Sequence, residues 1–202
     1  MGGSSKMKSR TILKHILGII FLSILFSACG SLEPEAANDS FFPMKVGNIW
    51  YYNSTPTGDL SDATKWEIVS KKQFAGNDYY QLVQSYNNSY SDTVYYRIEN
   101  NKLIQLLIDK NPNSYYFETV AADFNLDVNG SFRYYMEYVS GKEYYYDVTI
   151  KSKSDDEITF FYNSPNAVDE EHSVTYKKGV GVSESYSDAW GIHSYLIHQE
   201  LK

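Results

Sequence analysis

The chain of 202 residues carries 25 acidic and 18 basic side chains, which gives a formal net charge of −7 at pH 7. An acidic surface repels phosphate backbones and anionic lipid headgroups, so the composition argues against a nucleic-acid-binding protein and against membrane attachment through a basic patch. The single cysteine excludes an intramolecular disulfide framework, so the fold must be stabilised by its hydrophobic core.

Residues 1–28 are interpreted as a leader followed by a lipoprotein signal peptide. Residues 1–5 resemble an added leader, and a basic region that starts at Met7 precedes the apolar run 16–26. This run is short for a transmembrane helix, which needs about 20 apolar residues. Small residues then lead to Cys29, where a signal peptidase would cut and the thiol would be acylated. We expect Cys29 to be the lipidated first residue of the mature protein, rather than part of a transmembrane anchor or a free thiol.

Removal of the leader changes the charge and sets the location. Four basic residues and no acidic residue precede Cys29, so the mature net charge falls to about −11. The acyl chains would then hold the protein at the bacterial outer membrane, on its periplasmic face or at the cell surface. Residues 29–40 have no hydrophobic period and contain acidic side chains beside a proline, so we expect a flexible tether.

Residues 41–202 are predicted to form one all-β domain. Short segments rich in Tyr, Val, Ile, Phe and Thr alternate with clusters of Asn, Gly, Asp and Ser, which is typical of antiparallel sheets. The predicted strands are residues 49–54, 65–74, 78–86, 94–99, 102–109, 114–120, 131–139, 143–152, 157–162, 173–178, 182–186 and 194–200. Only residues 120–125 are compatible with a turn of helix.

Turn-forming residue pairs lie between several of these strands. The pairs are Gly76-Asn77, Asn87-Asn88, Asn100-Asn101, Ser140-Gly141 and Asp155-Asp156. Glycine, asparagine and aspartate tolerate the backbone angles of tight hairpin turns. Consecutive hairpins predict an antiparallel meander, and such sheets can leave one face in contact with water.

The segment 41–52 has a partial copy at residues 124–135. Phe42, Met44, Val46, Gly47, Trp50 and Tyr52 correspond to Phe124, Leu126, Val128, Gly130, Phe132 and Tyr134, with an extra residue near Asn129 in the second copy. Each copy would consist of an apolar arm, a glycine turn and a strand that places an aromatic ring in the core. The pattern has two explanations. It is either a chance similarity between two segments that lead into strands, or a duplication that gives two β-halves.

Tyrosine is abundant, with 20 residues, many of them in adjacent pairs. Because neighbours on a strand face opposite ways, each pair places one ring on each side of the sheet. One set fits the core, and the other forms either cross-strand aromatic packing or a surface that binds a ligand. The tyrosines that we assign to a ligand-binding face are Tyr80, Tyr96, Tyr116, Tyr135 and Tyr145.

Two motifs carry a family resemblance. Residues 42–52 resemble the PLKxGNxWxY opening of uncharacterised, Bacteroidetes-type bacterial lipoproteins, with Met44 in place of the usual leucine. Residues 176–182, followed by residues 195–197, resemble the KGVGLV ending of the same group. The resemblance implies a strongly curved antiparallel sheet or an incomplete barrel, similar to the half-barrels of periplasmic lipoprotein carriers. It does not identify a ligand.

No metal-binding motif is found in the sequence. His193 and His198 are placed on opposite faces of a regular strand, and His172 has no neighbouring ligand in the sequence. Residues 123–130 alternate oxygen-bearing side chains, but Met136 occupies the position that a terminal glutamate would need in a calcium loop. We therefore predict no metal and no cofactor.

Catalytic motifs are also missing, because the chain has no Gly-x-Ser-x-Gly elbow, no His-Glu-x-x-His and no phosphate-binding glycine loop. Scattered carboxylates, among them Glu137, Glu143 and Asp147, leave a hydrolase with an acid pair as an alternative. The sequence predicts a lipid-anchored, non-catalytic binding module for a glycan or an apolar molecule. The other alternative is a structural or assembly protein that uses its sheet edge or an aromatic patch against another envelope protein.

Overall fold

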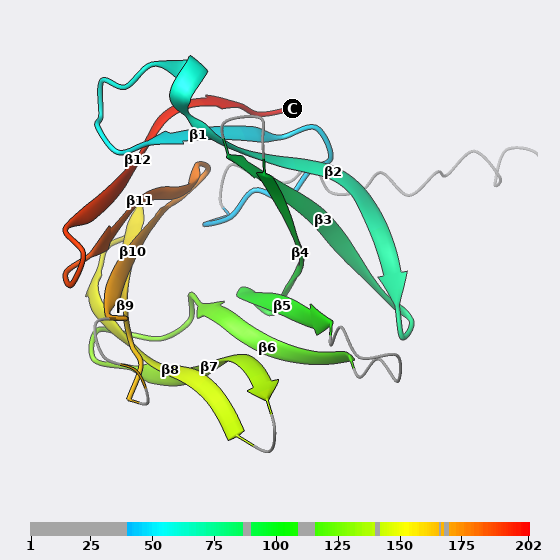
Figure 1. Ribbon diagram of the computed structural model, residues 1–202. Coiled ribbons are helices and arrows are strands. Elements are labelled where there is room, and N and C mark those ends of the chain that lie inside the picture. The colour runs from blue at the N-terminus through cyan, green and yellow to red at the C-terminus, as the bar shows by residue number, and fades with distance from the viewer. Residues whose placement is uncertain (1–39, 87–89, 109–115, 140–141, 166, 168–169) are drawn as a thin grey trace, which may run out of the picture. The chain divides into compact units, whose positions relative to one another are not determined.

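The computed structural model describes residues 40–86, 90–108, 116–139, 142–165, 167 and 170–202 (Figure 1). These residues belong to the second of two compact units, which spans Ala36–Lys202. The predicted signal peptide, the predicted lipidation site Cys29 and all but the last residue of the predicted tether lie outside the described residues.

In the described part of the chain twelve antiparallel strands form one sheet, which confirms the predicted all-β meander. The strands are β1 (Ile49–Asn53), β2 (Thr64–Phe74), β3 (Asn77–Tyr86), β4 (Tyr90–Glu99), β5 (Lys102–Ile108), β6 (Tyr116–Asp123), β7 (Ser131–Val139), β8 (Lys142–Lys153), β9 (Glu157–Asn163), β10 (His172–Lys177), β11 (Gly181–Ser187) and β12 (Ile192–Glu200). A short 3-10 helix, η1 (Leu60–Asp62), lies between β1 and β2. Residues 120–125, which the sequence left compatible with a turn of helix, form no helix, because β6 continues to Asp123.

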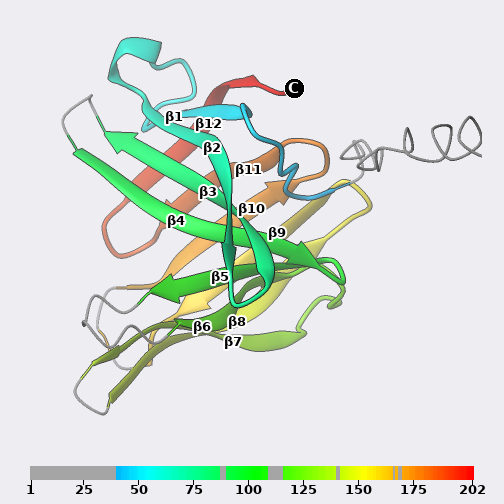
Figure 2. The ribbon, with the colours of Figure 1, turned by 90° about the vertical axis from the view of Figure 1, so that its right-hand side faces the viewer.

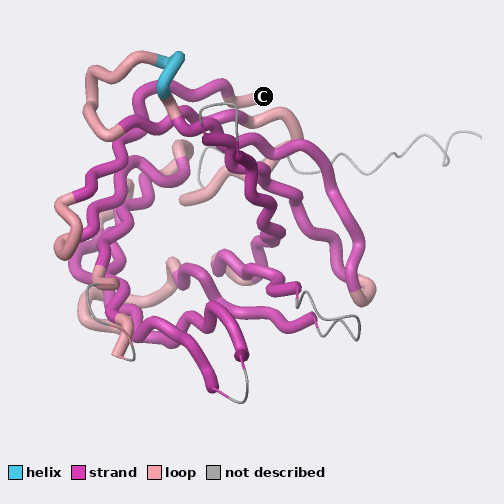
Figure 3. The backbone as a smooth tube through the Cα atoms, in the orientation of Figure 1, coloured by secondary structure: helices cyan, strands magenta, loops and turns pink. Residues whose placement is uncertain are grey.

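The strand order shows how the sheet closes. It runs β6-β5-β4-β3-β2-β1-β12-β11-β10-β9-β8-β7, so two meanders of six strands meet where β1 pairs with β12. Figure 3 shows the strands following one another around a common centre. In Figure 1 β3 and β4 lie on the other side of this centre from β9 and β10, and in Figure 2 β3 and β4 lie in front of them. The result is a nearly closed, barrel-like sheet with one unsealed seam between β6 and β7. The predicted strongly curved sheet or incomplete barrel is confirmed.

Side chains connect the two meanders across the β6–β7 seam. The backbone amide of Tyr135 donates a hydrogen bond to Thr119 Oγ1 at 2.9 Å, in place of a ladder bond. The Tyr134 hydroxyl donates to Gln105 Oε1 at 2.6 Å, and the Tyr162 hydroxyl donates to the Ala121 carbonyl at 2.8 Å. These bonds satisfy polar groups that the unsealed seam would otherwise leave unpaired.

The N-terminal arm, residues 40–48, fills one end of the barrel-like sheet. The interior of an eight-stranded barrel is just wide enough to be filled by side chains, and the diameter grows with strand number, so twelve strands need additional filling. Phe42 is only 2% exposed and stacks on Trp50, with ring centroids 5.5 Å apart. Its ring also meets Tyr96 and Tyr176 edge-on at 6.2 Å. We call the end of the sheet that this arm fills the closed end.

The buried polar groups of the closed end are satisfied. The Trp50 indole donates from Nε1 to the Val180 carbonyl at 2.6 Å. Asn48 donates from Nδ2 to the Pro43 carbonyl and accepts the Lys202 amide at Oδ1, each at 2.9 Å. The packing around Trp50 is close, because a Cβ at Gly181, which has a φ of 102°, would lie 3.3 Å from Trp50 Nε1.

The N-terminal arm is held to β2 by two backbone hydrogen bonds. The Gly47 amide donates to the Ile68 carbonyl at 2.8 Å, and the Ile68 amide donates to the Asn48 carbonyl at 3.0 Å. Gly47 has a positive φ of 91°, which glycine adopts without steric cost. The ladder between β2 and β3 shifts register directly after Ile68.

The second arm, residues 124–130, repeats this arrangement. The Asn129 amide donates to the Ile150 carbonyl at 2.9 Å, and the Ile150 amide donates to the Gly130 carbonyl at 3.0 Å. Asn129 also has a positive φ, of 68°, so it corresponds to Gly47, and Gly130 corresponds to Asn48. The extra residue expected near Asn129 is therefore absent, and the same spacing relates all matched positions. The repeated contacts support two β-halves, each of which opens with an arm.

Candidate functional site

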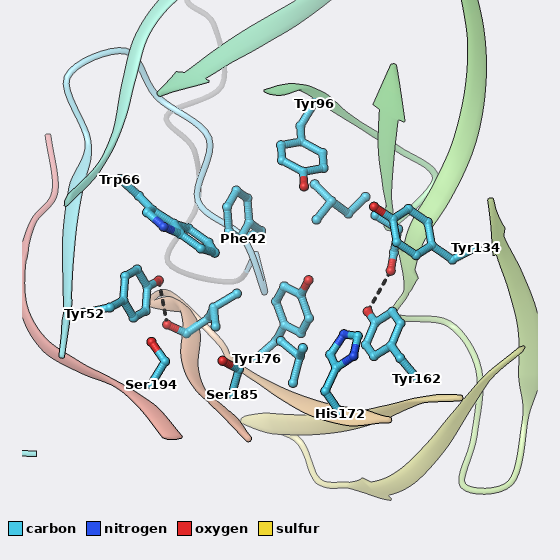
Figure 4. Close-up of a pocket in the computed structure, with 14 residues that line it drawn as sticks. Phe42, Tyr52, Trp66, Tyr96, Tyr134, Tyr162, His172, Tyr176, Ser185 and Ser194 are labelled. Atoms are coloured by element: carbon cyan, nitrogen blue, oxygen red, sulfur yellow. Dashed lines mark hydrogen bonds between the residues drawn. The ribbon is translucent and has the colours of Figure 1, made fainter. Parts of the chain in front are cut away.

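The inward-facing side chains line a partly open cavity of about 260 Å³ (Figure 4). Strand alternation decides which residues reach it, because every second residue of a strand points inward. Its lining residues come from both meanders and from the N-terminal arm: Phe42, Tyr52, Trp66, Tyr96, Leu103, Ala121, Tyr134, Tyr162, His172, Val174, Tyr176, Val182, Ser185 and Ser194.

The cavity has its floor toward the closed end of the sheet. Phe42 of the N-terminal arm forms this floor, and Figure 4 shows its ring between those of Trp66 and Tyr96. Ser185 and Ser194 lie opposite each other on β11 and β12, nearer to the turn that joins these strands. That turn lies at the other end of the sheet, which we call the open end.

Several tyrosine hydroxyls of the cavity are already bound to the protein. Tyr134 and Tyr162 donate to Gln105 and Ala121, and Tyr52 donates to the Val182 carbonyl at 3.0 Å. Burial raises the pKa of Tyr134 to about 12 and raises the pKa values of Tyr52 and Tyr162 well above their usual range. These hydroxyls are therefore neutral near pH 7 and position rings rather than carry charge.

Tyr96 offers a hydroxyl to the cavity interior. Figure 4 shows it pointing into the space between the rings, and no hydrogen bond links it to another residue of the described part of the chain. Burial raises the Tyr96 pKa well above its usual value, with a smaller contribution from the nearby Tyr134. A neutral hydroxyl in this position can donate a hydrogen bond to a bound molecule and accept one from it.

His172 is held between aromatic rings at the edge of the cavity. It stacks on Tyr162, with ring centroids 4.8 Å apart, and meets Tyr146 edge-on at 5.0 Å. Its Nδ1 lies 3.1 Å from the Glu170 carbonyl oxygen. Burial lowers the His172 pKa, and this outweighs the opposing influence of Glu170. The imidazole is therefore neutral near pH 7.

The tyrosines assigned to a ligand-binding face separate into two groups. Tyr96 lines the cavity, and Tyr80 pairs with it on the same face of the sheet but packs against the core outside the cavity. Tyr135 and Tyr145 pair with each other on the outer face, with ring centroids 5.9 Å apart. The side chain of Tyr116 lies outside the described residues.

Sequence reasoning missed most of the aromatic residues that line the cavity. The tyrosine pairs in the sequence point to neither Trp66 nor Tyr162, and they place Tyr135 rather than its neighbour Tyr134 on the ligand-binding face. A usable signal was present, because the repeated arms align Tyr52 with Tyr134. These two residues are equivalent in the structure, and both line the cavity.

The histidine pair of β12 differs from the prediction. A register shift between β1 and β12 leaves one residue of β12 without a partner, so Tyr51 pairs with His198 and Tyr52 pairs with Leu196. Because Tyr52 faces the cavity, Tyr51 and His198 face outward. His193 precedes Ser194, which lines the cavity, so His193 also faces outward. The two histidines thus share one face, and placing them on opposite faces was wrong.

The described residues contain no cluster of three metal-ligating side chains. Of the carboxylates considered for a hydrolase, Asp147 pairs with Arg133 at 3.2 Å on the outer face. The side chains of Glu137 and Glu143 lie outside the described residues.

A second, more polar space lies at the open end. This cleft has a volume of about 620 Å³ and is lined by Tyr52, Asn53, Ser54, Thr55, Gly58, Asp59, Asp62, Thr64, Tyr86, Ile192, His193 and Ser194. Tyr52 and Ser194 line both the cavity and the cleft, so the two spaces adjoin at these side chains.

Comparisons of the chain with known protein families, with curated proteins and with solved structures find no match. Within the part of the chain that the structure describes, no helix has the length and apolar character needed to cross a bilayer.

Proposed function

We propose that this protein is a lipid-anchored, non-catalytic binding module of the bacterial cell envelope that takes up a small, largely apolar ligand in its interior cavity. The observation that carries the proposal is the aromatic-lined cavity of about 260 Å³, into which Tyr96 points a hydroxyl that has no partner among the described residues. Concave, mostly apolar spaces with a few placed polar groups are the usual form of small-molecule sites. The anchor rests on the position of Cys29 after an apolar run, and it would hold the module at the outer membrane.

The geometry favours an apolar molecule over a glycan as the occupant of this cavity. The volume lies just below the range of about 300–1,000 Å³ that is usual for drug-sized ligands, so an oligosaccharide would not fit. The tyrosines of the outer face are poorly placed to stack on a sugar ring. The Arg133 guanidinium lies 4.0 Å from the centroid of the Tyr145 ring and covers that face of the ring.

The ligand is expected to be uncharged. Among the described residues, no Asp, Glu, Lys or Arg lines the cavity, and the histidine that does is held neutral by burial. Transfer of an unpaired charge into such surroundings is strongly unfavourable. A single hydroxyl or carbonyl on the ligand would pair with Tyr96.

A series of straight-chain primary alcohols tests this proposal. Each CH₂ buried contributes about 0.8 kcal/mol, so the affinity is expected to rise about fourfold per added carbon until the cavity is full. Ser185→Leu places a larger side chain inside the cavity and is expected to abolish binding. Isothermal titration calorimetry measures both effects.

Ser173→Leu is the matched control, because Ser173 precedes the inward-facing Val174 on β10 and therefore points to the outer face. It should retain the full alcohol series. Affinity that does not depend on chain length, or equal losses in both leucine variants, would exclude the interior cavity as the site.

Ligand binding is also expected to depend on pH through His172. Its pKa in the folded protein lies below the ordinary 6.5, so the neutral form predominates above that pH and both stability and affinity are fully present there. As the pH falls below 6.5, the unfolded chain takes up the proton that the folded site resists, so stability decreases. Affinity decreases as the pH approaches the folded pKa, because a proton on His172 then places a charge among Tyr162, Tyr146 and Glu170. Titration of 1-hexanol between pH 7.5 and pH 5 measures the effect on affinity, and His172→Phe should remove most of it. An unchanged pH profile in that variant would assign the dependence to another group.

A further inference from the structure

The polar cleft at the open end suggests that the cavity holds only part of the ligand. Tyr52 and Ser194 line both spaces, so the cleft lies directly beside the cavity at these side chains. We propose that the two spaces bind one amphipathic molecule, with its apolar part in the cavity and an uncharged, hydroxylated headgroup such as a single sugar in the cleft. This inference rests on the proposed function and specifies the class of ligand.

The composition of the cleft selects the headgroup. Its lining includes amide, hydroxyl and carboxylate groups from Asn53, Thr64 and Asp62, and none of the described residues that line it is Lys or Arg. A sugar offers hydroxyls that both donate and accept, and such a lining supplies partners for both roles. A phosphate or carboxylate headgroup would meet two aspartates without a lysine or arginine in that lining, which disfavours anionic amphiphiles.

The cleft is also a built site, because its loop is held in place before any ligand arrives. Asn53 donates from Nδ2 to the Asp59 carbonyl at 3.2 Å and accepts the Thr55 amide at Oδ1 at 3.3 Å. Asp59 accepts the Ser61 amide at 2.9 Å and caps η1. A Cβ on Gly58 would lie 2.2 Å from the Asn53 side chain, so the loop packs against it with no spare room. A preorganised loop loses little conformational entropy on binding.

Apolar and polar lining residues thus meet at one junction. Tyr52 contacts Trp66 with ring centroids 4.7 Å apart on the cavity side. On the cleft side, Ile192 is 60% exposed at the start of β12, beside the outward-facing His193. An amphiphile would bring its headgroup linkage to Tyr52 and Ser194, where the lining changes from aromatic to hydroxyl-rich.

The test compares probes that share one apolar chain. Calorimetry of the purified full chain is carried out with 1-octanol, n-octyl β-D-glucoside, sodium octanoate, octylamine and glucose, each below its micellar concentration. The glucoside is expected to bind about tenfold more tightly than octanol, because its hydroxyls gain partners in the cleft. Octanoate should bind more weakly than octanol, and glucose alone should not bind measurably.

Two variants separate the cleft from the cavity. Asp62→Ala is expected to lower the glucoside affinity toward that of octanol and to leave octanol unchanged, whereas Ser185→Leu should abolish binding of both. Octanol that binds while the glucoside binds no better would overturn the headgroup inference and leave the proposed function standing. Failure of every octyl probe would overturn the proposed function, and octylamine as the tightest probe would replace the sugar with a cationic headgroup.

Discussion

Replacement of Phe42 by alanine is expected to lower the free energy of unfolding by about 3–5 kcal/mol, the usual cost of truncating a buried aromatic side chain. Phe42 is 2% exposed and stacks on Trp50, which is completely buried. Its ring also contacts Tyr96 and Tyr176 at their edges. Residues 40–48, the arm that carries Phe42, precede β1 and belong to no strand of the sheet. The neighbouring rings therefore cannot fill the space left by the Phe42 ring unless the arm moves.

The same substitution should change what the cavity accepts. Phe42 forms the cavity floor, so its removal deepens the cavity and should move the optimum of the alcohol series to longer chains. Unfolding in urea measures the stability, and the chain-length profile measures the depth. At the temperature of the binding assay, the variant must first be shown to remain folded by circular dichroism.

Phe124→Ala provides the matched control. Phe124 is 3% exposed, occupies the equivalent place in the second arm and stacks on Phe41 with ring centroids 5.2 Å apart, but it does not line the cavity. It should cost a similar amount of stability and leave the alcohol optimum unchanged. A shift of the optimum in both variants, or in neither, would contradict the assignment of Phe42 as the cavity floor.

The strands were predictable because each signal for them is local. Asn100 and Asn101 have φ values of 49° and 57°, which asparagine tolerates well, and they join β4 to β5 as the sequence indicated. The turn between β2 and β3 lies at Ala75 and Gly76, one position before the predicted pair. Turn chemistry fixes where strands end, so the meander could be predicted before the sheet was known.

The phase of the tyrosine alternation was not predictable in the same way. Alternation says that the two rings of a pair face opposite ways, but it does not say which ring faces inward. The second tyrosine of a pair faces inward at Tyr80 and Tyr96, and outward at Tyr135, because β7 follows its arm with Phe132 and Tyr134 inward. A register shift after Tyr135 shows that such phases also change within a strand. The order of residues along the chain contains no direct record of these shifts.

Closure of the sheet was also beyond local signals. The ladder between β1 and β12 joins residues from opposite ends of the domain, and the sequence carries no mark for that pairing. The repeated arm was the best indication, because a duplicated six-stranded meander has two edges to join. The β1–β12 joint is closed by a backbone ladder, whereas the β6–β7 seam is bridged, among the described residues, only by hydrogen bonds that involve side chains. The two joints should therefore respond differently to the loss of side-chain hydrogen bonds.

The double variant Thr119→Val with Tyr162→Phe is expected to lower the free energy of unfolding by about 2–5 kcal/mol. Thr119 is 4% exposed and accepts the Tyr135 amide, so valine leaves that amide without its partner. The Tyr162 hydroxyl is the donor to the buried Ala121 carbonyl, which loses its cross-seam hydrogen bond in the same way. Each change keeps the shape of the side chain and removes only the polar atom that crosses the seam.

Thr159→Val is the control for this variant. The Thr159 hydroxyl lies 3.1 Å from that of Thr175, but β9 and β10 are also joined by a backbone ladder. Loss of this side-chain contact should cost no more than about 1.5 kcal/mol and should leave the local protection of both strands intact. Urea unfolding compares the stability of the two variants.

Hydrogen exchange then shows where the double variant opens. Amides of β6 and β7 should exchange through local opening, while those of β1 and β12 keep the protection of the intact protein, because their ladder does not depend on these side chains. Ala121 and Tyr162 also line the cavity, so an opened seam gives the ligand a second route and should speed both association and dissociation of hexanol. Loss of stability with uniform exchange across all strands would mean that the two hydrogen bonds support the whole fold rather than the seam.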